Sequence, residues 1–179
     1  CIFEYIYFAR LDSKIDNISV YEARIRGGAT LAKTYPVDAD LVCGVPDSGL
    51  ASAKGYSEES GIPFGLAFHK NSYVGRTFIK PTQKERESSV KIKLSVLESV
   101  VKGKRIVLVD DSIVRGTTIS NLITMLRKAG ATEVHVRISS PPFLHPCYFG
   151  TDVPSNKQLI ASSHSTEEIR QQIGADSLG

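Results

Sequence analysis

One stretch in the middle of the chain, residues 105–120, constrains the fold more than any other because it joins four features in a fixed order. The short apolar run from Ile106 to Val109 is rich in β-branched residues and predicts a buried strand. Asp110 and Asp111 follow at its C-terminal end, where open α/β sheets place their ligands. A loop of small and hydroxylated residues comes next, and then apolar residues at helical spacing: Ile119, Leu122, Ile123 and Leu126. The stretch therefore predicts an α/β fold with a ligand site at this strand end.

The loop after the two carboxylates has the chemistry of a phosphate site. Backbone N–H groups in a tight loop at a helix N-terminus can surround a phosphate monoester. Thr117 and Thr118 add hydroxyl donors, and Gly116 removes a side chain that would block close approach. Asp110 and Asp111 would repel a phosphate, so they suit sugar hydroxyls or a divalent metal that also touches the ligand. The alternative, an acidic strand end before an ordinary helix, fits a lone Asp-Asp pair better than it fits the whole run.

A second strand–loop–helix unit precedes the first along the chain. Leu41 to Val45 predicts a strand, and Asp47, Ser48 and Gly49 form the turn at its C-terminal end. A small-residue helix then runs through Ala51, Ala53 and Tyr56 and stops at Gly61. From the residues alone, a plain tight turn between strand and helix is the favoured interpretation.

The segment from His69 to Lys93 is basic and rich in turn residues. Such a segment is usually a solvated loop. In an enzyme that must shield a reactive sugar cation from water, it can also be a mobile lid that an anionic substrate draws shut. Its basic residues are Lys70, Arg76, Lys80, Lys84, Arg86, Lys91 and Lys93.

Other segments carry weaker signals. Glu4 to Phe8 predicts an opening strand or a packed arm, and Phe64 to Phe68 predicts a strand, as does Glu133 to Ile138. The capping-box spacing at Ser19 predicts a helix towards Lys33, and the one at Ser165 predicts a short helix that ends at Gly174. The histidines have no ligand-like spacing, so we interpret them as structural or surface residues.

The totals favour one ordinary globular domain over residues 1–179. Hydrophobic residues make up 41% and charged residues 23% of the chain, and the net charge of +3 is far from the clustered basic stripe of a nucleic-acid binder. No apolar run has membrane-spanning length and no signal-peptide pattern opens the chain, so we expect a cytoplasmic location. Cys1, Cys43 and Cys147 contain no CxxC pair and indicate neither a disulfide framework nor a zinc site.

The central stretch resembles the signature of the type I phosphoribosyltransferases, which bind 5-phosphoribosyl-1-pyrophosphate (PRPP). Further stretches resemble the glutamine PRPP amidotransferase family: CIFEYIYFAR at 1–10, GVPDSG at 44–49, YVGRTFI at 73–79 and VHVRISSPP at 134–142. The match covers essentially the whole chain but only the family's phosphoribosyltransferase half, so we expect the glutaminase domain to be absent. The resemblance implies a type I phosphoribosyltransferase fold, in which helices flank a central, mainly parallel, twisted sheet.

The resemblance also implies a reaction, in which ammonia displaces pyrophosphate from PRPP to give 5-phosphoribosylamine in the first step of purine biosynthesis. Asp110 and Asp111 are expected to hold the ribose hydroxyls, directly or through Mg²⁺, with Ser48 near that metal. The turn from Asp47 to Gly49 is expected to face the pyrophosphate, which reverses the plain-turn interpretation. The 5′-phosphate is expected to bind the loop formed by Ser112, Ile113, Val114, Arg115, Gly116, Thr117 and Thr118.

The basic segment resembles the flexible loop of the same family. Lys70, Tyr73 and Arg76 match positions that the resemblance implies are catalytic, and Lys93 matches a substrate or nucleotide contact. The segment departs from the family at His69 and at Ser72, where arginine is common.

The cysteines have family counterparts as well. Cys1 and Cys147 match two of the four cysteines that hold a [4Fe–4S] cluster in one branch of the family. The other two would lie beyond Gly179, so we do not expect this chain alone to assemble the cluster. Cys1 is not interpreted as a glutaminase nucleophile, because the residues after it match the middle of the family sequence. Cys43 is expected to be a small core residue.

Two rival functions stay open at this point. The chain could attach ribose phosphate to a purine or pyrimidine base, or it could sense PRPP or purine nucleotides without turnover. The partners expected from the resemblance are PRPP, ammonia (free or supplied by a separate chain), purine nucleotides as inhibitors, and further copies of the chain in a homo-oligomer. Neither nucleic acid nor membrane is expected as a partner. Rossmann and Walker glycine fingerprints do not occur in the sequence.

Overall fold

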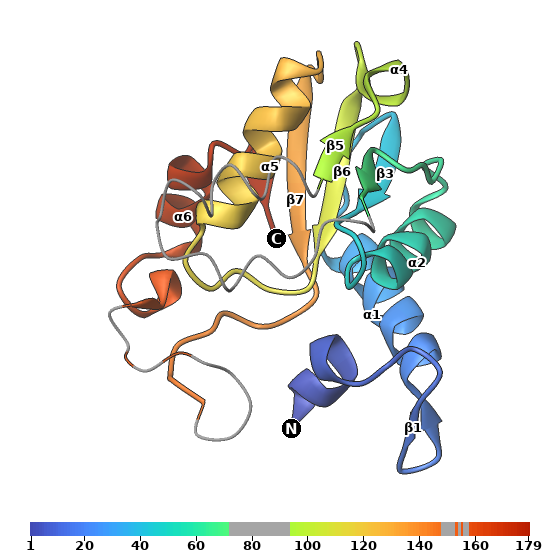
Figure 1. Cartoon of the computed structure of the whole chain (residues 1–179), viewed down its shortest axis with the longest axis vertical. Helices are drawn as coiled ribbons and strands as arrows, with labels where there is room; N and C mark the ends of the chain where they lie inside the picture. The colour runs from blue at the N-terminus through green and yellow to red at the C-terminus, as the bar shows by residue number, and fades with distance from the viewer. Residues whose placement is uncertain (72–93, 148–152, 154, 156–157) are drawn as a thin grey trace.

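A computed structural model describes residues 1–71, 94–147, 153, 155 and 158–179. Its centre is a four-stranded sheet in the order β3-β6-β7-β8, and every neighbouring pair is parallel (Figure 1). The strands are β3 (Leu41–Gly44), β6 (Arg105–Asp110), β7 (Glu133–Ile138) and β8 (Ser177–Leu178). The parallel sheet and three of its strands were predicted from the sequence, and these predictions are confirmed.

Helices cover both faces of this sheet. α1 (Val20–Thr34) and α2 (Leu50–Ser60) lie on one side, and α5 (Thr117–Lys128) and α6 (Thr166–Ile173) lie on the other (Figure 1). Side chains alternate along β6: Ile106 and Leu108 belong to the apolar cluster that includes α5 and α6, whereas Val107 and Val109 join a second cluster with α2. The run from 106 to 109 is continuously apolar because β6 is buried on both faces.

The helix ends follow the signals in the sequence. The Ser19 hydroxyl accepts a hydrogen bond from the Glu22 N–H group at the start of α1. Ser165 and Glu168 form a complete capping box at the start of α6. Gly61 and Gly174 adopt positive φ angles of 73° and 77° where α2 and α6 end, a conformation that glycine reaches without strain.

The structure corrects two strand predictions. Glu4–Phe8 is a π-helical turn, η1, in which the Ala9 N–H group donates to the Glu4 carbonyl at 3.0 Å. The predicted strand from Phe64 to Phe68 is reduced to one parallel bridge between Phe64 and Val42. Glycine and alanine within that run have low strand propensity, which weakened the prediction.

Several short elements complete the chain. β4 (Phe68–Lys70) pairs antiparallel with β5 (Leu94–Val96) at one end of the molecule (Figure 1). The remaining elements are β1 (Lys14–Ile15), β2 (Ile18–Ser19), α4 (Glu98–Val101) and the 3-10 turn η4 (Ile160–Ser162). No helix in the described part of the chain is long and apolar enough to cross a membrane.

The backbones of α1 and α2 touch where the two helices cross. A Cβ atom added at Gly28 would lie 1.8 Å from the Ser52 carbonyl oxygen, and one added at Gly55 would lie 2.0 Å from the Ile25 carbonyl oxygen. Both glycines are therefore required by the close approach of the helices. This crossing fixes α2, and with it the loop that joins β3 to α2.

We predict that Gly28→Ala lowers the free energy of unfolding by about 1–3 kcal/mol, because the added methyl group must push the two backbones apart. Gly27→Ala is the matched control in the same helix, since a Cβ there meets nothing within 4 Å. Its better helix propensity should raise stability by up to about 1 kcal/mol. Urea denaturation of both variants checks this, and equal effects would contradict the packing argument.

Candidate active site

The C-terminal ends of β3 and β6 are joined directly. The Val45 N–H group, just after β3, donates to the Val109 carbonyl of β6 at 2.9 Å. A Cβ atom on Gly49 would lie 2.3 Å from the same carbonyl oxygen, so the turn over residues 45–49 packs its bare backbone against β6. Within this turn the Pro46–Asp47 peptide bond is cis. The two loops that the sequence predicts as binding elements are therefore neighbours.

The acidic pair is held by the main chain. Asp110 and Asp111 are only 7% and 8% exposed. The N–H groups of Ser139 and Ser140, which follow β7, donate to the carbonyls of Asp110 at 3.0 Å and of Asp111 at 2.9 Å. The Asp111 N–H group donates to the Asp110 carboxylate at 2.8 Å, and the Ser112 hydroxyl donates to the Asp111 carboxylate. Both acids thus have fixed positions at the carboxyl edge of the sheet.

Placing two carboxylates side by side in a buried position is electrostatically costly. Burial raises the pKa of Asp110 well above its usual range, and the negative charge of Asp111 raises it further. A bound cation or sugar hydroxyl groups would relieve this cost. Stability alone does not account for such a pair, whereas a binding role does.

A buried arginine lies near the acidic pair. Arg24 of α1 donates hydrogen bonds to the carbonyls of Tyr5, Tyr7 and Ala9 at 2.7, 3.2 and 3.0 Å. Burial lowers the pKa of its guanidinium, and attraction to Asp111 opposes that shift. Arg24 therefore ties the N-terminal segment to the core and adds a positive charge on the Asp111 side of the site.

The predicted phosphate loop leads into α5 as expected for an anion site. Gly116 has φ of +80° and, as the N-cap, supplies no side-chain acceptor for the first N–H groups of the helix. Thr117 and Thr118 are exposed. Uncapped N–H groups at the positive end of a helix favour an anion.

The rest of the loop faces the C-terminal part of the chain. The Val114 carbonyl accepts a hydrogen bond from the Ile160 N–H group at 2.9 Å, and Arg115 donates one to the Gln158 side chain. Ile113 is half-buried and packs against the core. These contacts brace the loop, while the exposed threonines at its end are the groups accessible to a ligand.

Lys70 reaches the turn after β3. It is the last residue of β4, and its ammonium group forms an ion pair with the Asp47 carboxylate. The structure thus brings a predicted catalytic residue beside the predicted pyrophosphate turn, which also contains Ser48. The other predicted residues of the basic segment, Tyr73, Arg76 and Lys93, lie outside the described residues, as does most of the proposed lid.

The donors available at this edge suit magnesium held jointly with a substrate. Within the described ranges, no group of three or more His, Cys, Asp or Glu side chains could hold a metal ion by itself. Asp110, Asp111 and the Ser48 hydroxyl offer only hard oxygen atoms. Mg²⁺ prefers such donors and commonly takes its remaining ligands from water and substrate phosphates.

The cysteines contribute no chemistry to this edge. Cys43 lies in β3 and is completely buried, which raises the pKa of its thiol to about 12 and confirms it as a core residue. Cys1 is exposed and Cys147 is half-buried. The segments that carry Cys1 and Cys147 lie side by side, since the ring centroids of Phe3 and Phe143 are 5.4 Å apart.

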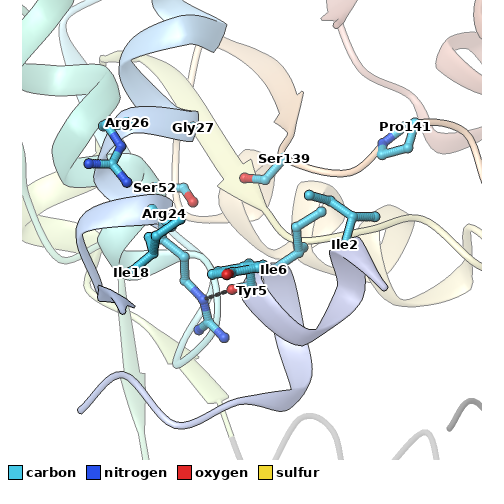
Figure 2. Close-up of a pocket in the computed structure, with 11 residues that line it drawn as sticks. Ile2, Tyr5, Ile6, Ile18, Arg24, Arg26, Gly27, Ser52, Ser139 and Pro141 are labelled. Carbon is cyan, nitrogen blue, oxygen red and sulfur yellow. Dashed lines mark hydrogen bonds between the residues drawn. The ribbon is translucent and has the colours of Figure 1, made fainter. Parts of the chain in front are cut away.

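Sequence reasoning missed the support behind the acids. Ser139 and Ser140 entered it only within a resemblance, although their place just after a parallel strand could have suggested contact with the site. Ser139 also borders a cavity of about 360 Å³ between the N-terminal segment and α1, whose walls include Arg24, Ser52 and Ile6 (Figure 2). Its buried hydroxyl oxygen has no hydrogen-bond partner among the residues described.

Comparison with known proteins adds relatives to this geometry. A family model described as a phosphoribosyl transferase domain matches residues 16–139. Amidophosphoribosyltransferase from Bacillus subtilis is 60% identical over 178 residues, covering 99% of this chain and 37% of the relative. The enzyme of the same name from Methanocaldococcus jannaschii is 59% identical over 179 residues, covering 100% of this chain and 38% of the relative.

A solved structure agrees with these relatives. The glutamine phosphoribosylpyrophosphate amidotransferase from B. subtilis, complexed with ADP and GMP, matches with a TM-score of 0.90 at 60% identity, over 99% of this chain and 39% of that chain. This chain therefore spans less than two fifths of the length of the relatives that it matches. The family model covers more than half of the chain and includes both strand-end loops and the acidic pair, so the chain belongs to the phosphoribosyltransferase domain family.

Proposed function

We propose that this chain is the phosphoribosyltransferase part of an amidophosphoribosyltransferase and that it transfers the phosphoribosyl group of PRPP to ammonia. One observation carries the proposal: the ends of β3 and β6 bring a helix N-terminus, a buried acidic pair and a backbone-lined turn to one edge of the sheet. These three elements match the three parts of PRPP, which are a 5′-phosphate, a ribose and a pyrophosphate. The product would be 5-phosphoribosylamine, the start of purine biosynthesis.

The chemistry of this reaction requires positioning more than proton transfer. Breaking the bond between C1 and pyrophosphate leaves positive charge on the ribose and negative charge on the leaving group. The 5′-phosphate would bind the N–H and hydroxyl groups from Ser112 to Thr118, and the ribose hydroxyls would contact Asp110 and Asp111. Lys70 and the N–H groups of the turn from Asp47 to Gly49 would stabilise the leaving pyrophosphate. Bound Mg²⁺ would supply Lewis-acid stabilisation of that charge.

The names of the relatives favour ammonia over a nucleobase as the acceptor. Both curated relatives quoted above are amidophosphoribosyltransferases, and the B. subtilis structure was solved with ADP and GMP. We infer that purine nucleotides inhibit this chain as well, and that its activity belongs to the cytoplasm. A homo-oligomer and ammonia delivery by another chain or domain are further parts of the proposal. The proposed contacts of Tyr73, Arg76 and Lys93 also stay predictions.

We predict that Asp110→Asn/Asp111→Asn reduces ammonia-dependent release of pyrophosphate from Mg²⁺–PRPP by about 100-fold or more, because transition-state charge and ribose position both depend on the pair. Pyrophosphate release with and without an ammonium salt, at alkaline pH, measures this. Asp12→Asn is the control, since the Asp12 side chain is 69% exposed and pairs only with Arg10 among the contacts of the described residues. Release no faster than without enzyme, or equal release by the double variant, would contradict the proposal.

A second prediction concerns stability and pH. The pKa of Asp110 is raised in the folded protein, so its contribution to stability is complete below the unfolded pKa near 4 and is lost as pH rises through the folded pKa. Asp110→Asn removes this loss and keeps an oxygen that can accept the Asp111 N–H group. The variant should therefore melt at a higher temperature than the parent at pH 7–8, with the difference shrinking as pH falls towards 4. Scanning calorimetry across this range checks it, and a constant difference would show that burial of the charge is not responsible.

A further inference from the structure

The ion pair between Lys70 and Asp47 connects two parts of the site that are far apart in the sequence. Lys70 ends β4, which pairs with β5, and Asp47 lies in the turn that packs against the end of β6. The Lys70 side chain is 34% exposed and the Asp47 side chain is 68% exposed. The pair is therefore accessible to a ligand that enters at the carboxyl edge of the sheet.

The position of Asp47 conflicts with a direct role in binding pyrophosphate. The backbone of its turn can donate hydrogen bonds to an anion, but a carboxylate has no donor and repels one. The packing of the turn does not depend on this carboxylate either, since Val45 and Gly49 make the contacts with Val109. The ion-pair partner that the structure gives the Asp47 carboxylate is Lys70.

We propose, on the basis of the function proposed above, that Asp47 is an internal stand-in for the pyrophosphate of the substrate. In the unliganded protein its carboxylate holds Lys70 at the site. When pyrophosphate arrives, Lys70 exchanges a single carboxylate for a more highly charged anion. Asp47 thus keeps the lysine in place before binding and competes with the ligand for it.

The exposure of both side chains sets the size of the effect. A solvated ion pair is weak, so pyrophosphate can displace it and the exchange is reversible. Removing the competing carboxylate should therefore tighten binding of pyrophosphate by only about two- to five-fold. Removing Lys70 should weaken binding, because the anion then loses a positive partner.

The test is a double-mutant cycle on binding of inorganic pyrophosphate in the presence of Mg²⁺, measured by isothermal titration calorimetry. We expect Asp47→Asn to bind about two- to five-fold more tightly than the parent. In a Lys70→Met background, the same substitution should change the affinity much less, because no lysine is left to release. Asp47→Glu keeps the charge and should bind like the parent.

Glu58→Gln is the matched control. It breaks the exposed ion pair between Glu58 and Lys54 on α2 and removes the same formal charge. It should leave pyrophosphate affinity unchanged, so that a general effect of net charge is separated from the effect at Asp47. Thermal unfolding of each variant verifies that the affinities refer to folded protein.

The outcomes separate this inference from the function on which it rests. Equal or weaker binding by Asp47→Asn would overturn the inference, while pyrophosphate binding by the parent would still support the proposed function. A gain of the same size in the Lys70→Met background would also overturn it, because simple repulsion by Asp47 would then explain the result. Absence of pyrophosphate binding in the parent and in every variant would overturn the proposed function and the inference together.

Discussion

The hydrogen bond from the Val45 N–H group to the Val109 carbonyl is the contact on which the candidate site depends. It joins the ends of two parallel strands and brings the turn after β3 against the carbonyl that precedes Asp110. Gly49 allows this approach because any Cβ atom there would collide with the same carbonyl oxygen. The turn, the acids and the start of α5 form one edge only because β3 and β6 are adjacent in the sheet. The crossing of α1 and α2 supports this arrangement from behind by fixing the helix that follows the turn.

Stability and binding make opposite demands at this edge. The apolar residues of β6 are buried on both faces and stabilise the sheet, whereas the two acids that follow are buried at an electrostatic cost. The main chain compensates in part, since Ser139 and Ser140 extend the β7 side of the ladder onto the acid carbonyls. A site of this kind is preorganised, and its unfavourable charge is relieved when a metal-bound sugar phosphate occupies it.

The parts of the fold that sequence reasoning predicted are those that local chemistry determines. The apolar run of β6, the helical spacing of α5 and the capping serines of α1 and α6 each carry their own signal. The segment over residues 4–8 was less predictable, because its aromatic residues also fit a strand and its conformation depends on Arg24, more than ten positions away. The partners within the site were also hidden: nothing local in the sequence links Lys70 to Asp47 or the two serines to the acids, since these contacts arise only from the order of strands in the sheet.

The most direct test of the whole account is a crystal structure of this chain with PRPP and Mg²⁺. The account predicts the 5′-phosphate at the N–H groups that begin α5, the ribose hydroxyls beside Asp110 and Asp111, and the pyrophosphate against the turn over residues 47–49. PRPP bound in the opposite orientation, or at another place on the molecule, would contradict the claim that these strand ends form the phosphoribosyl site.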